Sequence, residues 1–118
     1  MTKESFFNAI RTNTAIGGST NAQVHITAMA KHAGIEITAS EGEGNSHHLP
    51  LLANVQPSGK YLCEAFYRAG GVPAVMSELL KHNELYGQVM TVSGKTLEEN
   101  LKGREISNSK VIAKFEEP

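Results

Sequence analysis

The stretch Asn8-Ala-Ile-Arg-Thr-Asn-Thr-Ala-Ile-Gly-Gly-Ser-Thr-Asn21 decides how this chain of 118 residues folds and what it can bind. It runs an apolar, helix-like segment into two glycines, and then through a serine, a threonine and an asparagine into a second helix-like segment. Phe6 and Ile10 are four residues apart, which predicts an amphipathic helix over 3–16 that the glycines end.

The second helix of this stretch is predicted over 21–33. Thr20-Asn-Ala-Gln23 matches the capping box, in which the threonine hydroxyl and the glutamine side chain each satisfy an exposed backbone N–H group. Gly34 is a natural C-terminal cap. The apolar line of this helix is Ala22, Ile26, Met29 and Ala33.

Two interpretations of Gly17 to Asn21 remain open from the residues alone. A helix start with free N–H groups, glycines that let a ligand come close, two hydroxyls and an amide would suit a carboxylate or a hydroxyl-bearing substrate. The same residues also satisfy the capping rule completely, as a tight turn between two helices would require. The chemistry alone favours the capped turn.

Three more helices are predicted by apolar spacing and turn signals: one over 62–69, one from Pro73 to about His82, and a short one opened by the capping box Thr96-Leu-Glu-Glu99. The stretch 39–48 has no periodicity and many turn formers, which predicts an exposed loop. Short strands are predicted at 35–38, 49–55 and 88–92. The expected fold class is therefore α/β, rich in helices with a few short strands.

The composition excludes several classes of protein. Eleven Lys and Arg against twelve Asp and Glu give a net charge of −1, which offers no electrostatic footprint for nucleic acid or an anionic membrane. No apolar run approaches the roughly 20 residues of a membrane helix. Lys3 and Glu4 interrupt any secretory signal. We expect a cytoplasmic, reduced protein.

Two lysine motifs invite a phosphate-binding hypothesis. Gly94-Lys-Thr96 follows a predicted strand and precedes a helix, as in a P-loop, but that motif also needs a glycine where this chain has Val89. A capped turn is the better interpretation. Pro57-Ser-Gly-Lys-Tyr61 is either a tight turn or a backbone that approaches a ligand and offers Lys60 to an anion.

The spacing of the histidines and the single cysteine does not predict a metal site. His47 and His48 are adjacent, and His25 and His32 are two helical turns apart, so neither pair has the spacing of zinc ligands. Cys63 is the one cysteine of the chain, which excludes an internal disulfide. We expect it to be a small packing residue.

Several blocks of the sequence occur in one order: Asn8-Ala-Ile, Ala15-Ile-Gly-Gly-Ser-Thr-Asn-Ala22 with His25, Pro57-Ser-Gly-Lys-Tyr61, Ala69-Gly-Gly-Val-Pro-Ala-Val-Met76, Thr91-Val-Ser-Gly-Lys-Thr96 and Glu99-Asn100. Together they resemble the dihydroxy-acid dehydratase / phosphogluconate dehydratase family. The resemblance runs from about Ser5 to about Asn100, and it is closest to the sugar-acid (pentonate or aldonate) branch through 49–57 and 66–73. Residues 39–46 depart from the family, which usually has an acidic and aromatic helical stretch there.

This resemblance implies a larger enzyme, a hydro-lyase that removes water from a 2,3-dihydroxy acid or sugar acid and yields a 2-keto acid. An iron–sulfur cluster and Mg²⁺ would act as Lewis acids, and a serine of a second, β-barrel domain would serve as base. The implied partner is a small-molecule acid, and the parent enzyme would be a homo-oligomer. The branched-chain amino-acid enzyme of the family is the near alternative.

The resemblance assigns no catalytic residue and no metal ligand to this chain. The family's cluster cysteines and magnesium ligands lie upstream of the match, and its serine base lies downstream. Residues 1–103 would be the C-terminal part of the family's first, α/β domain, and 104–118 a linker or tail toward a second domain. Ser19, Thr20 and Asn21 are the predicted substrate contacts. The isolated chain is expected to be inactive, and a non-catalytic anion-binding module is the alternative.

Overall fold

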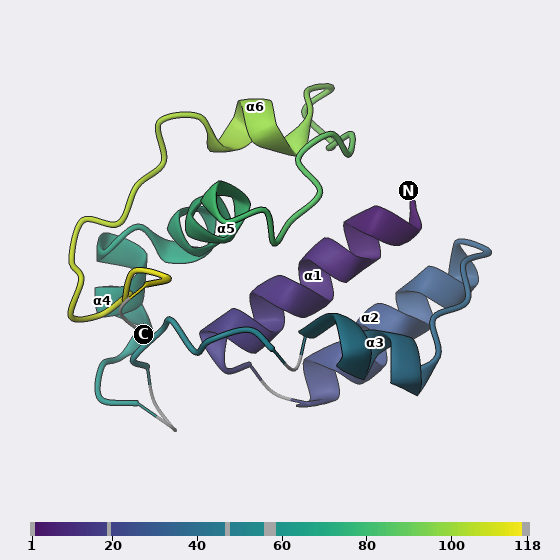
Figure 1. Ribbon diagram of the computed structural model, residues 1–118, viewed down its shortest axis with the longest axis horizontal. Coiled ribbons are helices and arrows are strands. Elements are labelled where there is room, and N and C mark those ends of the chain that lie inside the picture. Colours follow the sequence, from purple (N-terminus) through teal and green to yellow (C-terminus); the bar gives the residue numbers. More distant parts are fainter. Residues whose placement is uncertain (1, 19, 47, 56–58, 117–118) are drawn as a thin grey trace.

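The computed structural model describes residues 2–18, 20–46, 48–55 and 59–116. Within these ranges the chain forms six helices, and Figure 1 shows α1, α2 and α3 gathered on one side and α4, α5 and α6 on the other. Helix α1 contacts both groups, because it packs against α2, α3 and α5. In chain order the helices are α1 (Lys3–Ile16), α2 (Thr20–His32), α3 (Ala39–Ser46), α4 (Cys63–Arg68), α5 (Gly71–Lys81) and α6 (Leu97–Leu101).

The five helices predicted from the sequence are confirmed, with ends shifted by a few residues. Thr96 caps α6 through a capping box with Glu99, as predicted. Helix α2 takes in Thr20 as its first residue, one position earlier than expected. None of the helices in the described ranges has the length and apolar character that crossing a lipid bilayer requires.

The three predicted strands are not confirmed. In the described part of the chain, 49–55 and 88–92 form only isolated bridges: Ala53 with Ile112, Val55 with Tyr61, and Met90 with Thr96. Each of these pairings stops after one bridge. The structure is therefore helical where the sequence predicted an α/β pattern.

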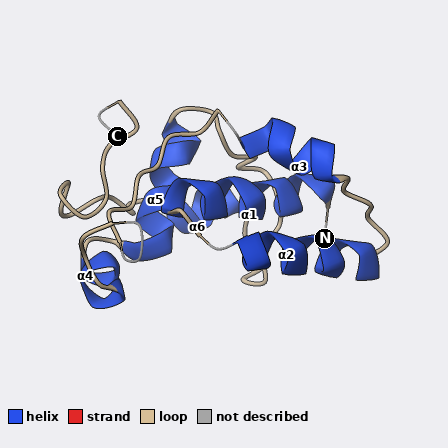
Figure 2. Cartoon of the chain, turned by 90° about the horizontal axis from the view of Figure 1, so that it is seen from below, coloured by secondary structure: helices blue, strands red, loops and turns tan. Residues whose placement is uncertain are grey.

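Helix α3 corrects the prediction of an exposed loop over 39–48. Its start is capped by Thr38, whose hydroxyl accepts a hydrogen bond from the N–H of Glu41 at 3.1 Å. Gly42 is buried, and a β-carbon there would lie 2.9 Å from the amide of Gln23. The glycine that suggested a loop thus allows α3 to approach Gln23 of α2 closely. Figure 2 shows α3 as a helix beside α1.

The main hydrophobic core lies between the end of α1 and helices α4, α5 and α6. It includes Val111 and Ile112, which are 1% and 0% exposed, although 104–118 was expected to be a linker or tail. The division of the chain at residue 103 stays a prediction. The buried members of this core are Ala15, Leu49, Leu52, Ala69, Ala74, Val75, Leu79, Leu85, Leu97, Leu101, Val111 and Ile112.

A second, smaller core joins α1 to α2. Phe6 and Ile10 of α1 meet Ala30 of α2, and Ile37 closes the cluster from the segment before α3. Helix α2 packs along α1 through this cluster. One side of α2 is left at the surface.

Candidate functional site

The turn between α1 and α2 begins with a Schellman motif. Gly17 has a left-handed backbone with φ of 76°. Its N–H donates to the carbonyl of Thr14 at 3.0 Å, and the N–H of Gly18 donates to the carbonyl of Asn13 at 2.8 Å. These two bonds satisfy carbonyl groups at the end of α1 and need a residue that tolerates positive φ. The first glycine is thus explained by the turn alone.

Gly18 is needed for a different reason. A β-carbon at this position would collide with the side-chain oxygen of Asn13. The backbone of Gly18 therefore passes close to the last turn of α1, and a larger residue there would require the Asn13 side chain to move. Together the two glycines bring the chain sharply round into α2.

The three predicted substrate contacts follow this turn. Ser19 lies outside the described residues. Thr20 is the first residue of α2, and Asn21 follows it on the exposed surface of the helix. Asn21 is thus the member of the predicted site that the structure describes at the surface.

A second predicted segment lies next to the same turn. The carbonyl of Ala15 accepts a hydrogen bond from the N–H of Leu52 at 2.7 Å, which holds the 49–55 segment against the end of α1. Asn54 then binds the following loop: its side-chain oxygen accepts from the N–H of Lys60 at 2.7 Å, and its carbonyl accepts from the N–H of Tyr61 at 2.9 Å. The structure thus connects the Gly17–Asn21 stretch to the end of the Pro57–Tyr61 stretch.

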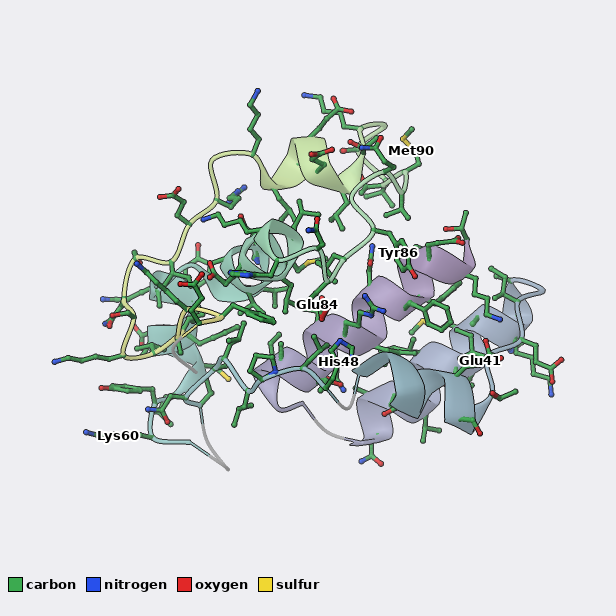
Figure 3. The ribbon with its side chains drawn as sticks, viewed as in Figure 1. Glu41, His48, Lys60, Glu84, Tyr86 and Met90 are labelled. Atoms are coloured by element: carbon green, nitrogen blue, oxygen red, sulfur yellow. The ribbon has the colours of Figure 1, made fainter. Side chains whose placement is uncertain are left out.

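The Lys60 side chain is exposed, and its amine lies 5.6 Å from the centre of the Tyr61 ring. Figure 3 shows Lys60 pointing outward at the edge of the molecule. Gly59 is needed because a β-carbon there would lie 2.3 Å from the backbone nitrogen of Val55. The tight-turn interpretation of this loop therefore has direct support, and Pro57 and Ser58 lie outside the described residues.

The Thr91–Thr96 block lies elsewhere, beside α6 at the top of Figure 1, far from the turn between α1 and α2. Its conformation is set by its own side chains. The Thr91 hydroxyl donates to the carbonyl of Lys95 at 2.7 Å and accepts from the amide of Asn100 at 2.6 Å. Ser93 donates to the side-chain oxygen of Asn100 at 3.0 Å. These bonds support the capped-turn interpretation over a P-loop.

A polar contact that the sequence reasoning did not single out as structural links α1 to the 84–86 loop. The buried amide of Asn8 donates to the carbonyl of Tyr86 at 2.9 Å and accepts from its N–H at 2.8 Å. One turn later, Arg11 donates to the carbonyl of Glu84 at 2.6 Å. The sequence offered one signal for this contact: Asn8 is an amide residue on the same face of α1 as the buried Thr12 and Ala15.

Glu84 also connects the 84–86 loop to His48, which follows α3. Its carboxylate lies 2.7 Å from Nε2 of His48, and Figure 3 shows the two side chains facing each other beside α1. The histidine is thus a partner in an ion pair or hydrogen bond. Cys63, expected to be a packing residue, is exposed instead, at the first position of α4.

The residues of this chain do not fit an iron–sulfur cluster or a magnesium site on their own. A cluster needs several cysteine ligands, whereas the sequence has one. Across the described ranges, no three His, Cys, Asp or Glu side chains come together as metal ligands. We therefore derive no chemical step through either group.

Three surface hollows, of about 430, 400 and 550 Å³, lie among residues of α4, α5, α6 and their connections. The residues that line these hollows all lie between positions 60 and 105 of the sequence, and none of them belongs to α2. The exposed Asn21 is not among the residues that line these three hollows.

Three curated relatives match this chain along most of its length. The chain is 56% identical over all 118 residues to the D-xylonate dehydratase of Caulobacter vibrioides, of which it covers 20%. It is 44% identical over 112 residues, 95% of its length, to the L-arabinonate dehydratase of Rhizobium leguminosarum bv. trifolii, covering 19%. It is 51% identical over 102 residues, 86% of its length, to the dihydroxy-acid dehydratase of Lactococcus lactis subsp. cremoris, covering 18%.

The chain thus spans about a fifth of the length of the curated relatives it matches. The family model described as dihydroxy-acid/6-phosphogluconate dehydratase N-terminal matches residues 1–100, which include the Gly17–Asn21 turn, the 57–61 loop and the Thr91–Thr96 turn. This chain belongs to the dihydroxy-acid/6-phosphogluconate dehydratase family, within the N-terminal domain of that family.

Proposed function

We propose that this chain is part of a hydro-lyase that dehydrates a 2,3-dihydroxy sugar acid to a 2-keto acid. The observation that carries the proposal is the 56% identity to a D-xylonate dehydratase along all 118 residues. The 51% identity to a dihydroxy-acid dehydratase extends over only 102 residues and supports the branched-chain enzyme as the second candidate. The parent domain would have the α/β fold expected from the sequence.

Within this enzyme, the start of α2 would bind the substrate. Ser19, Thr20 and Asn21 would offer hydroxyl, amide and backbone N–H groups to the carboxylate or hydroxyls of the acid. The surface position of Asn21 in the first turn of a 13-residue helix supports this role, because the helix dipole favours an anion there. These residues would hold and orient the substrate, while the bond-breaking groups come from other parts of the enzyme.

By itself the chain should not turn over substrate, because one cysteine cannot hold a cluster. An assay for 2-keto acid with xylonate, arabinonate and a branched 2,3-dihydroxy acid tests this. We expect no product from the purified 118-residue chain. Turnover would refute the expected inactivity.

A chimera tests the function itself. In the D-xylonate dehydratase of Caulobacter vibrioides, the matched residues are replaced by the 118 residues of this chain. We expect the chimera to dehydrate xylonate faster than a branched 2,3-dihydroxy acid. The opposite preference would favour the second candidate, and a folded but inactive chimera would contradict the proposal.

The substrate contacts are tested in the same chimera. Asn21→Ala should raise KM for xylonate about tenfold, as expected for the loss of roughly 1.4 kcal/mol of binding. Gln88→Ala, which also removes an exposed amide, should leave KM unchanged. If the two variants behave alike, Asn21 does not bind the substrate.

Calorimetry of the isolated chain with aldonic acids distinguishes the alternative, a non-catalytic anion-binding module, from a part of the enzyme. Metal-independent binding that Asn21→Ala abolishes would favour the module. An absence of heat, together with an active chimera, would favour the enzyme part.

A further inference from the structure

The largest of the three surface hollows lies where the segment after α6 meets the connection between α4 and α5. Its volume is about 550 Å³, which is within the size range of small-molecule sites. Figure 1 shows the segment after α6 passing beside α4 and the start of α5. Residues from both parts of the chain line the hollow, so its shape depends on a tertiary contact.

Two hydrogen bonds from Ser107 hold these two parts of the chain together. Its N–H donates to the carbonyl of Ala69 at 2.8 Å, and its hydroxyl donates to the carbonyl of Arg68 at 2.9 Å. Gly70 permits the close approach, because a β-carbon there would lie 2.9 Å from the carbonyl oxygen of Glu105. The backbone on both sides of the hollow is thus held in place.

The charged side chains of the hollow are positive. Among the described residues that line it, these are Arg68 of α4 and Arg104 of the segment after α6, and there is no Asp or Glu. Within the described ranges, the exposed Arg104 has no ion-pair partner. Arg68 lies 2.8 Å from the carboxylate of Glu64, but both side chains are 75% exposed, and an exposed pair of this kind contributes little to stability. Both arginines can therefore bind an anion, and each guanidinium group can donate two parallel hydrogen bonds to a carboxylate or a phosphate.

The rest of the lining includes apolar side chains and two aromatic rings. Phe66 is half-buried, whereas Tyr67 is 79% exposed and Val72 is 43% exposed. Pro73 also lines the hollow. An exposed aromatic ring can stack on a flat ligand, and a guanidinium group can stack on one as well. The hollow thus combines positive charge with an apolar surface.

We propose that this hollow binds a small organic anion in which a phosphate or carboxylate group is attached to a flat ring. The anionic group binds Arg68 and Arg104, and the ring packs against Tyr67 and Val72. The inference does not depend on the proposed function, because none of the residues that line the hollow belongs to α2.

An NMR titration of the isotope-labelled 118-residue chain tests the proposal. Phenyl phosphate and benzoate are the probes, since each joins one anionic group to a flat ring. We expect saturable shifts in the backbone signals of Gly70, Gly71 and Arg104, and no shift in the signal of Asn21. The probe that binds more tightly identifies the anionic group. Inorganic phosphate and acetate, which lack the ring, should each bind at least about threefold more weakly than the ring compound with the same anionic group.

Substitutions test the two arginines. Arg68→Gln and Arg104→Gln should each lower the affinity for the tighter probe at least about tenfold, because each removes charged hydrogen bonds to the anion. Lys110→Gln removes a positive charge from an exposed position outside the hollow and should leave the affinity unchanged. Glu64→Gln releases Arg68 from its ion pair and should raise the affinity about twofold. Circular dichroism checks that the variants are folded.

Several outcomes would overturn the proposal. One is the absence of saturable shifts at millimolar concentrations of either probe, and another is the same affinity in the two arginine variants as in Lys110→Gln. Equal binding of the ring compounds and their ring-free counterparts would leave a bare anion site. Shifts centred on Asn21 would place the binding at α2 instead. A chimera without xylonate turnover would contradict the proposed function and leave this titration unaffected.

Discussion

At the scale of single residues, Gly17 shows how one backbone angle shapes the turn between α1 and α2. Its φ of 76° suits glycine, and a side chain at that angle is strained. Gly17→Ala should therefore cost about 1 kcal/mol of the free energy of unfolding. The measurement is urea unfolding followed by circular dichroism.

Gly44 provides the matched control for this substitution. It lies inside α3, and a β-carbon there would meet nothing within 4 Å. Gly44→Ala should stabilise the chain by about 0.5–1 kcal/mol, because alanine is the better helix former. Equal effects at both glycines would show that Gly17 is not required by the turn.

The carboxylate of Glu41 carries a pH dependence. Lys3 of α1 reaches it with a 2.5 Å contact, and the hydrogen bond from this ammonium lowers the pKa of Glu41. A lowered pKa in the folded state stabilises the fold above the carboxyl group's ordinary value, and this contribution is lost as the pH falls through the folded pKa. The Lys3–Glu41 ion pair thus links α1 to α3 at neutral pH, and this ion pair is lost when acid protonates Glu41.

We expect Lys3→Gln to raise the pKa of Glu41 toward its ordinary value. Titration of the Glu41 carboxyl carbon by NMR measures the change, and Lys102→Gln, on an exposed lysine elsewhere, is the control. An unchanged Glu41 titration in Lys3→Gln would contradict the assignment of the ion pair.

At the scale of elements, α1 holds the 84–86 loop through one buried amide. Asn8→Ala would remove both hydrogen bonds to the backbone of Tyr86 and leave its N–H and carbonyl without them. The expected loss in the free energy of unfolding is about 1–3 kcal/mol. The midpoint of urea unfolding measures it.

An exposed amide gives the comparison for Asn8. Gln88 donates to Glu98 at 2.8 Å on the surface, and Gln88→Ala should cost less than about 0.5 kcal/mol. If Asn8→Ala is no more destabilising than Gln88→Ala, the amide does not hold the loop.

Helices were more predictable from this sequence than extended segments. Apolar spacing and the Thr96 capping box indicated α6, and the glycines indicated the ends of α1 and α2. The pattern over 49–55 is apolar because Leu52 and Ala53 are buried, and burial alone cannot tell a strand from an extended segment that makes one bridge.

Helix α3 was missed although Thr38 and Glu41 form a capping box at its start. Two glycines outweighed that signal, because glycine usually breaks helices, whereas Gly42 is used here for close packing. At the candidate site, the sequence predicted the turn and its glycines. It could not predict that Asn54 connects the 52–54 segment to Lys60 and Tyr61, because that contact depends on the tertiary fold.

At the scale of the whole molecule, the last segment of the chain completes the main core. The N–H of Asn54 donates to the carbonyl of Val111, and the N–H of Ala113 donates to the carbonyl of Leu52, both at 2.8 Å. Buried Glu78 accepts from the N–H of Phe115 at 3.0 Å, which fixes the segment against α5. Residues from both ends of the chain thus share one interior.

This arrangement makes Ile112 a sensitive position, because its side chain is 0% exposed between segments far apart in sequence. Ile112→Ala should cost about 2–5 kcal/mol, from lost burial and from the cavity left behind. Lys110→Ala, at an exposed position two residues away, should change the free energy of unfolding by less than about 0.5 kcal/mol. If Ile112→Ala were as mild as Lys110→Ala in urea unfolding, the last segment would behave as the linker expected from its polar sequence. A large loss would instead require moving the domain boundary beyond residue 112.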